Sequence, residues 1–170
     1  MSTEMVSRIA ELATAPIKVP RARVRSEWID YNNHMNVAYY VMAFDEALEQ
    51  VYGQIGLGEP YRAATDNSTM TLEMHVNYLR EIKEGEPYDI DAQILGADAK
   101  RVCMFFVMRH GETGVRVATS ESMMIHVSLS ERRSTPFPDD VRDRLATIAE
   151  GHAALEWPPE AGRAVGFKKR

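Results

Sequence analysis

A chain of 170 residues is long enough for one domain with a substantial core and short for two. Its composition, 45% hydrophobic and 26% charged, is that of a globular protein, and its formal charge of −5 argues against a nucleic-acid binder with a broad basic surface. The longest apolar stretch, residues 102–108, is far too short to cross a bilayer, and the N-terminus lacks the order of a signal peptide. We therefore expect a cytoplasmic protein with no membrane or nucleic-acid partner.

The N-terminal part is expected to hold one strand and one long helix. Residues 1–18 predict a loose or docked arm with one helical turn at most. Residues 20–25 alternate small or apolar with basic side chains, which is typical of an exposed or edge strand. Over residues 37–55 apolar side chains recur at steps of three and four, which predicts an amphipathic helix. Four residues that favour turns close this helix, namely Gly53, Gly56, Gly58 and Pro60.

The rest of the chain is expected to be mostly strands. Four are predicted after a polar loop at 66–68, over residues 70–78, 88–94, 102–108 and 115–127. The third is apolar at every position, as in a central strand covered on both faces. It contains the only cysteine, Cys103, which excludes an intrachain disulfide and is expected to be a small buried hydrophobe. In the last strand the apolar side chains at 115, 117, 123, 125 and 127 are expected to form one face, which Glu121 interrupts as either a bulge or a polar pocket. A short helix at 141–151 precedes the tail.

This order of elements favours an α+β fold, in which an antiparallel curved sheet wraps around one long central helix. We divide the chain into an N-terminal arm at 1–18, a main domain at 19–130, and a C-terminal short helix and tail at 131–170.

Polar side chains are concentrated just before the predicted helix, in the run Asp30-Tyr31-Asn32-Asn33-His34-Met35-Asn36. A structured turn or a helix cap needs one or two such residues, not five. The order D-x-N-x-H-x-N, followed by Tyr39 and Tyr40, resembles the signature loop of hotdog-fold acyl thioesterases of the acyl-carrier-protein and 4-hydroxybenzoyl-CoA groups. Asn33 stands where many of these proteins have glycine, and asparagine also adopts a left-handed backbone, though less freely.

The resemblance covers about residues 19–128 and implies a hotdog-fold thioesterase that acts on an acyl-CoA, works as a homodimer or homotetramer and needs no cofactor. Asp30, the loop's only carboxylate, is the candidate general base or nucleophile, and the sequence leaves both roles open. Asn32 and His34 match polar catalytic positions of the resembling proteins. The backbone N–H groups at 36–38 are placed to hold an oxyanion at the positive end of the helix dipole.

A second carboxylate is a further catalytic candidate. Glu81 lies where some of the resembling proteins carry an acid, and Glu73 is a weaker alternative because it shares the polar face of its strand with His75 and Asn77. We find no spacing that predicts a metal site.

Substrate contacts are expected from aromatic and amide side chains of the same region, namely Trp28, Tyr31, Asn36 and Tyr39. Trp28 and Tyr31 lie outside the helix and are free to line a pocket, whereas Tyr40 and Phe44 are expected in the core. An aromatic box is the usual way to hold a quaternary ammonium group. The run from Trp28 is similar to that of the thioesterases of carnitine breakdown, which release glycine betaine from betainyl-CoA.

Two alternative functions remain open, a medium-chain or aromatic acyl-CoA thioesterase and a non-catalytic acyl-CoA-binding module. Basic residues are expected to hold the phosphates of CoA, and the candidates are Arg80, Lys83, Lys100, Arg101, Arg132 and Arg133.

Overall fold

The structure is a computed structural model that describes residues 3–167, so that the basic end of the chain at 168–170 lies outside the described residues. The helices are α1 (Thr3–Leu12), α2 (Val37–Ile55), α3 (Glu59–Thr65) and α4 (Asp139–His152), with a 3₁₀ turn η1 (Ser26–Trp28). The strands are β1 (Ile17–Arg23), β2 (Asn67–Tyr78), β3 (Pro87–Ala97), β4 (Arg101–His110), β5 (Arg116–Ser128) and β6 (Arg133–Ser134). None of the helices within 3–167 is long and apolar enough to span a membrane.

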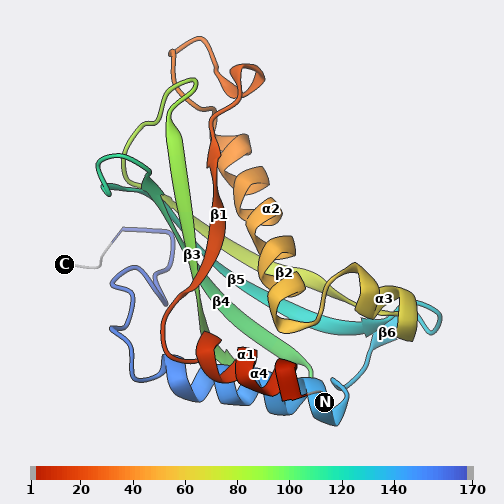
Figure 1. Ribbon diagram of the computed structural model, residues 1–170. Helices are drawn as coiled ribbons and strands as arrows, with labels where there is room; N and C mark the ends of the chain where they lie inside the picture. The colour runs from red at the N-terminus through yellow and green to blue at the C-terminus, as the bar shows by residue number, and fades with distance from the viewer. Residues whose placement is uncertain (1–2, 168–170) are drawn as a thin grey trace.

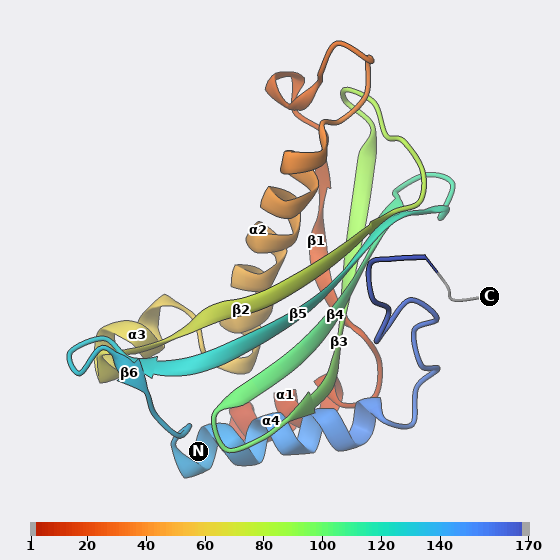
Figure 2. The same cartoon turned by 180° about the vertical axis from the view of Figure 1, so that it is seen from behind.

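One curved antiparallel sheet in the order β1-β3-β4-β5-β2 wraps around α2, and the short β6 pairs with β5 (Figure 1). The α+β arrangement expected from the order of elements is confirmed. The helices α1 and α4 lie together at the end of the sheet where the β3–β4 turn also lies, while the loop before α2 lies at the opposite end (Figures 1 and 2).

The long helix begins and ends where the sequence predicts. The Asn36 side chain accepts a hydrogen bond from the Ala38 N–H and so caps the N-terminus, and Gly56 ends the helix in the left-handed conformation with φ of 78°. One face of α2 is buried against the sheet, where the Phe44 ring lies 6.2 Å from that of Phe106 on β4. The expectation that Tyr40 and Phe44 belong to the core is confirmed.

The central strand β4 is covered on both faces, as predicted. Phe106 faces α2, and the neighbouring Phe105 points to the outer face of the sheet, yet both are almost fully buried. The C-terminal segment covers the outer face. It is held there by an ion pair between Arg116 and Glu160 and by the Gly162 N–H, which donates to the Glu121 carboxylate at 2.6 Å.

The polar role of Glu121 is therefore to fasten the C-terminal segment, and the alternative of a bulge at this position is wrong. The irregular register of β5 lies elsewhere, opposite Leu72 of β2 and beside Met108 of β4. The predicted apolar face of β5 is also corrected, because small residues, Ser120 and Ser122, face the helix where β5 pairs with Phe106 and Met104. Small side chains there leave room for the aromatic rings of α2 and β4.

The N-terminal arm is more ordered than expected, because α1 is a ten-residue helix packed on α4. Buried His152 explains the attachment. Its Nδ1 accepts the Ile94 N–H at 2.9 Å, so its Nε2 carries the proton and donates to the Leu12 and Ala15 carbonyl oxygens at 2.9 and 3.0 Å. The short helix α3 was not predicted, although Pro60 in its first turn, just after Gly58, is a helix-start signal.

Candidate active site

The loop between η1 and α2 is a closed turn fixed by backbone hydrogen bonds. The Asp30 N–H donates to the His34 carbonyl and the Asn33 N–H donates to the Asp30 carbonyl. Asn33 takes the left-handed conformation, with φ of 62°, which confirms the conformation considered for this position. At its end the loop is tied to its surroundings through the Met35 N–H, which donates to the Ile82 carbonyl at 2.9 Å. The loop is therefore a rigid support for its polar side chains.

The Asp30 carboxylate lies at the start of this turn. Its Oδ1 accepts the Asn32 N–H at 2.8 Å, which is an Asx turn, and its Oδ2 accepts the Asn36 side-chain amide at 3.3 Å. Within the described residues no lysine, arginine or histidine forms an ion pair with it. An ionised carboxyl has about four acceptor sites, so Asp30 keeps capacity to bind a water molecule.

The Asn36 amide joins Asp30 to the N-terminus of α2. Its nitrogen donates to Asp30, and its oxygen accepts the Ala38 N–H at 3.1 Å. The Val37 N–H has no hydrogen-bond partner within residues 3–167, and Val37 itself is exposed. A free backbone donor at the positive end of a nineteen-residue helix thus lies one residue from the side chain that holds the carboxylate.

Among the described residues, the side chains of the other catalytic candidates form no hydrogen bond or ion pair with the Asp30 carboxylate. Asn32 is exposed, and its hydrogen bond to Asp30 uses the backbone. His34 is partly buried and its Nδ1 lies 3.2 Å from the Met35 carbonyl oxygen. Glu81 is mostly exposed and its carboxylate lies 3.9 Å from the Lys83 ammonium. Glu73 is exposed on the outer face of β2.

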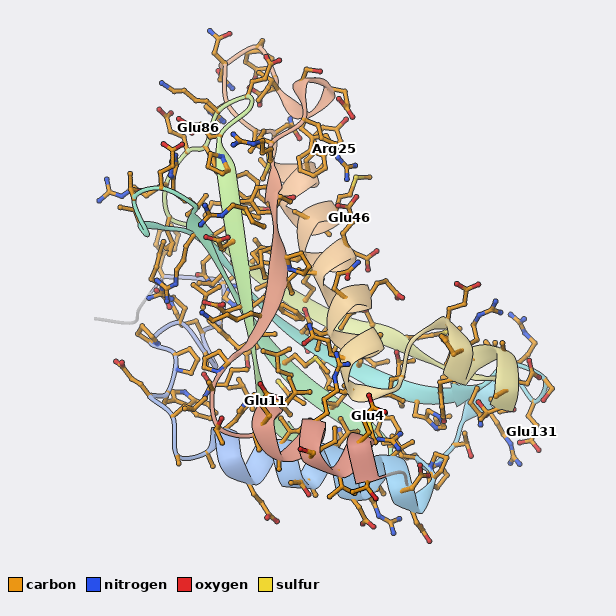
Figure 3. The ribbon with its side chains drawn as sticks, in the orientation of Figure 1. Glu4, Glu11, Arg25, Glu46, Glu86 and Glu131 are labelled. Atoms are coloured by element: carbon orange, nitrogen blue, oxygen red, sulfur yellow. The ribbon has the colours of Figure 1, made fainter. Side chains whose placement is uncertain are left out.

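Trp28 does not line an accessible pocket, which corrects our expectation. Only 1% of its surface is exposed, its ring stacks on Tyr39 at 5.6 Å, and the Arg25 guanidinium lies over it at 4.5 Å. Arg25 is held in place by Glu46 of α2 at 2.8 Å, and Figure 3 shows these two side chains close together beside the helix. The loop sequence does not indicate that the Trp28 ring is covered, because Arg25 comes before the loop and Glu46 lies in the middle of the helix that follows it.

Tyr31 and Tyr39 also differ from what was expected of substrate contacts. Tyr31 is 93% exposed at the tip of the loop. One face of the Tyr39 ring is covered by the stacked ring of Trp28 and is not open to a ligand. Tyr78, which the sequence assigned only to a strand, contacts the first residue of α2. The Tyr78 hydroxyl donates to the Val37 carbonyl at 3.3 Å, and its ring meets that of Tyr40 edge to face at 5.2 Å.

Comparison with known proteins identifies the family. Residues 24–145 match the model of the thioesterase-like superfamily. The chain belongs to this superfamily.

Two relatives and one solved structure illustrate the match to the thioesterase-like superfamily. A betainyl-CoA thioesterase of Pseudomonas aeruginosa is 40% identical, over 85% of this chain and 91% of its own length. An L-carnitine dehydrogenase/betainyl-CoA thioesterase of Rhizobium meliloti is 36% identical over 92% of this chain, which spans only 32% of that longer protein. A Staphylococcus aureus protein solved in complex with CoA has a TM-score of 0.80 and 29% identity, over 90% of this chain and 98% of that one.

In this thioesterase-like protein the basic candidates for CoA phosphates lie at two ends of the sheet. Arg80 and Lys83 follow β2 and flank Ile82, which holds the loop. Lys100 and Arg101 lie at the β3–β4 turn, where Arg101 pairs with Asp98, and Arg132 and Arg133 lie at the start of β6, where Arg133 pairs with Glu131. Only the first group is next to the loop.

Two further observations bear on the chemistry of this thioesterase-like site. Cys103 is half-buried on the outer face of β4, and burial raises the pKa of its thiol to about 11, so it is not an activated nucleophile. The residues that the structure describes contain no cluster of histidine, cysteine or carboxylate side chains that could hold a metal ion.

Proposed function

We propose that this chain hydrolyses betainyl-CoA to glycine betaine and free CoA. The observation that carries the proposal is the position of the Asp30 carboxylate, which has no ion-pair partner within residues 3–167 and accepts a hydrogen bond from the Asn36 amide. The residue after Asn36 is Val37, whose N–H has no hydrogen-bond partner among these residues. Thioester hydrolysis needs these two components, a base for water and a donor for the oxyanion. The acyl group is proposed from the relatives, two of which are named for betainyl-CoA.

In the proposed mechanism Asp30 acts as a general base. A water molecule bound to Asp30 attacks the thioester carbon, a C–O bond forms, and Asp30 accepts the water's proton. The carbonyl oxygen becomes an oxyanion and receives the Val37 N–H, with the dipole of α2 behind it. When the carbonyl re-forms, the C–S bond breaks and CoA leaves as a thiolate. Asn32 and His34 are proposed to orient the water or the carbonyl from the rim of the loop.

A panel of thioesters tests this function. Thiol release is measured at steady state with betainyl-, acetyl-, 3,3-dimethylbutyryl-, medium-chain and hydroxybenzoyl-CoA, and betainyl-CoA should have the highest kcat/KM. A higher value for a medium-chain or aromatic ester would replace the proposed substrate by that one. Stoichiometric binding of the esters without thiol release would replace the enzyme by a binding module.

We also propose a homodimer formed through β2, either alone or within a homotetramer. β2 is the last strand of the sheet, so one of its edges has unpaired N–H and C=O groups. Near its start Met70 and Leu72 expose more than half of their surfaces. Its end carries Tyr78 to the start of α2, so that pairing of two β2 edges puts the partner beside the site. The cytoplasmic location expected from composition stays a prediction.

A further inference from the structure

We propose that Tyr78 is the residue that makes this site select a positively charged acyl group, by placing an aromatic ring beside the trimethylammonium head. The inference rests on the proposed function, because it assigns a role within the same site. It replaces the aromatic box that the sequence placed on Trp28 and Tyr31.

The geometry of the acyl group limits where its cation can bind. In a betainyl thioester only one methylene separates the reacting carbonyl carbon from the quaternary nitrogen. An aromatic ring attracts a cation within about 6 Å of its centroid. Since the carbonyl oxygen is proposed to lie at the Val37 N–H, the selecting ring has to lie beside the first turn of α2.

The aromatic residues of the loop do not meet this requirement. One face of Trp28 is taken by Tyr39 and the ring also carries the Arg25 guanidinium at 4.5 Å. A second cation there would be repelled by the first. Tyr31 is almost fully exposed at the tip of the loop and has no ring partner among the described residues.

Tyr78 meets the requirement in three ways. Its hydroxyl donates to the carbonyl of Val37, the residue whose N–H is proposed to hold the oxyanion. Its ring is supported by Tyr40 at 5.2 Å and an interplanar angle of 83°, so its orientation is fixed by packing. It remains 49% exposed, so part of its surface is open to a ligand, and it ends the strand that we propose to pair with a second copy.

Two carboxylates act on the Tyr40 ring that supports Tyr78. Asp30 and Glu81 both act on Tyr40, whose pKa is raised to about 12, chiefly by burial and further by these two carboxylates. The Glu81 carboxylate lies 3.9 Å from the Lys83 ammonium, and because both side chains are mostly exposed this pair is weak. Carboxylates next to this pair of rings favour a cationic over a neutral acyl group.

Three substitutions test the role of Tyr78, with betainyl-CoA and its neutral isostere 3,3-dimethylbutyryl-CoA as substrates. The readout is the ratio of the two kcat/KM values. Tyr78→Leu should lower this ratio by about two- to thirtyfold, the range expected for one cation–π contact. Tyr78→Phe, which keeps the ring and loses the hydroxyl, should keep the ratio. Trp157→Leu, a change at an aromatic residue that is 59% exposed on the outer face, is the matched control and should leave the ratio unchanged.

An unchanged ratio in Tyr78→Leu, or an equal loss on both esters, would overturn the inference. Glu81→Gln provides a test that does not depend on packing, since this side chain is mostly exposed. It should lower the ratio at low ionic strength and have little effect at high ionic strength, and no effect at low salt would also count against the inference. Failure of the proposed function itself is seen separately, as a wild-type protein without thiol release or without preference between the two esters.

Discussion

The Asp30 carboxylate has a structural role, which its hydrogen bonds show, and a catalytic role, which we propose. It closes an Asx turn through Asn32 and holds the amide of Asn36, and it keeps acceptor capacity for water. From the sequence we considered a structured turn for this run of residues and a catalytic role for Asp30, and the geometry of Asp30 allows both together. The environment of Trp28 was not predictable in the same way, because Arg25, which covers its ring, is held there by Glu46 from the middle of α2. The spacing of residues in the sequence does not indicate that the Arg25 guanidinium covers the Trp28 ring.

We predict that Asp30→Asn lowers kcat by about 10² to 10⁴, the contribution typical of a positioned base, with the fold intact. Asparagine keeps an acceptor for the Asn32 N–H and loses the base. The control is Asp98→Asn, because Asp98 also closes a turn by accepting the Lys100 and Arg101 N–H groups, at the other end of the sheet. Thiol release and circular dichroism measure the two effects. Wild-type kcat in Asp30→Asn would remove Asp30 from the mechanism.

Among the elements, α2 was predicted best because its signals are local. Its apolar residues recur at helical steps, and its cap and its final glycine adjoin it in the sequence. Which face of β5 is buried was predicted wrongly. Ser120 and Ser122 are buried because small side chains fit the space beside the aromatic rings, and a hydrophobicity pattern does not indicate side-chain volume. In β2 the register shifts at Leu72, so the residues before it do not continue the inward and outward alternation of the residues after it. The sequence of β2 does not indicate this bulge.

Two glycines, one within α2 and one just after its last residue, should respond oppositely to the same substitution. Gly53 is exposed within the helix and an added Cβ would meet nothing within 4 Å, so Gly53→Ala should stabilise the protein by about 0.5 to 1 kcal/mol. Gly56 has φ of 78° and an added Cβ would have ordinary contacts, so Gly56→Ala should destabilise it by about 1 to 2 kcal/mol through backbone strain alone. Urea unfolding measures both changes. Equal signs for the two would contradict the assignment of the helix end.

For the whole molecule, the antiparallel sheet around one helix followed from the order of elements, and the covering of its outer face did not. The C-terminal segment has no periodic pattern, and only the folded chain brings Glu160 to Arg116 and Gly162 to Glu121. The same applies to α1, which is attached through a histidine of α4 that lies more than a hundred residues away.

Assembly should depend on the free edge of β2. Leu72→Lys places a charge among the exposed apolar side chains of this strand and should shift the protein to a monomer with reduced thioesterase activity. Val165→Lys is the control, because Val165 is also apolar and exposed but belongs to the C-terminal segment. Light scattering at micromolar concentration measures the mass. A wild-type protein that is monomeric and fully active would contradict the proposed dimer.

One of the two tryptophans of the sequence is buried and the other is exposed, so intrinsic fluorescence can follow two regions of the protein separately. Trp28 is buried against Tyr39 and a guanidinium, whereas Trp157 is mostly exposed on the C-terminal segment. A collisional quencher such as acrylamide should therefore reach Trp157 and spare Trp28. The emission that remains reports on the loop beside Asp30, and the emission that is lost reports on the segment that covers the outer face of the sheet.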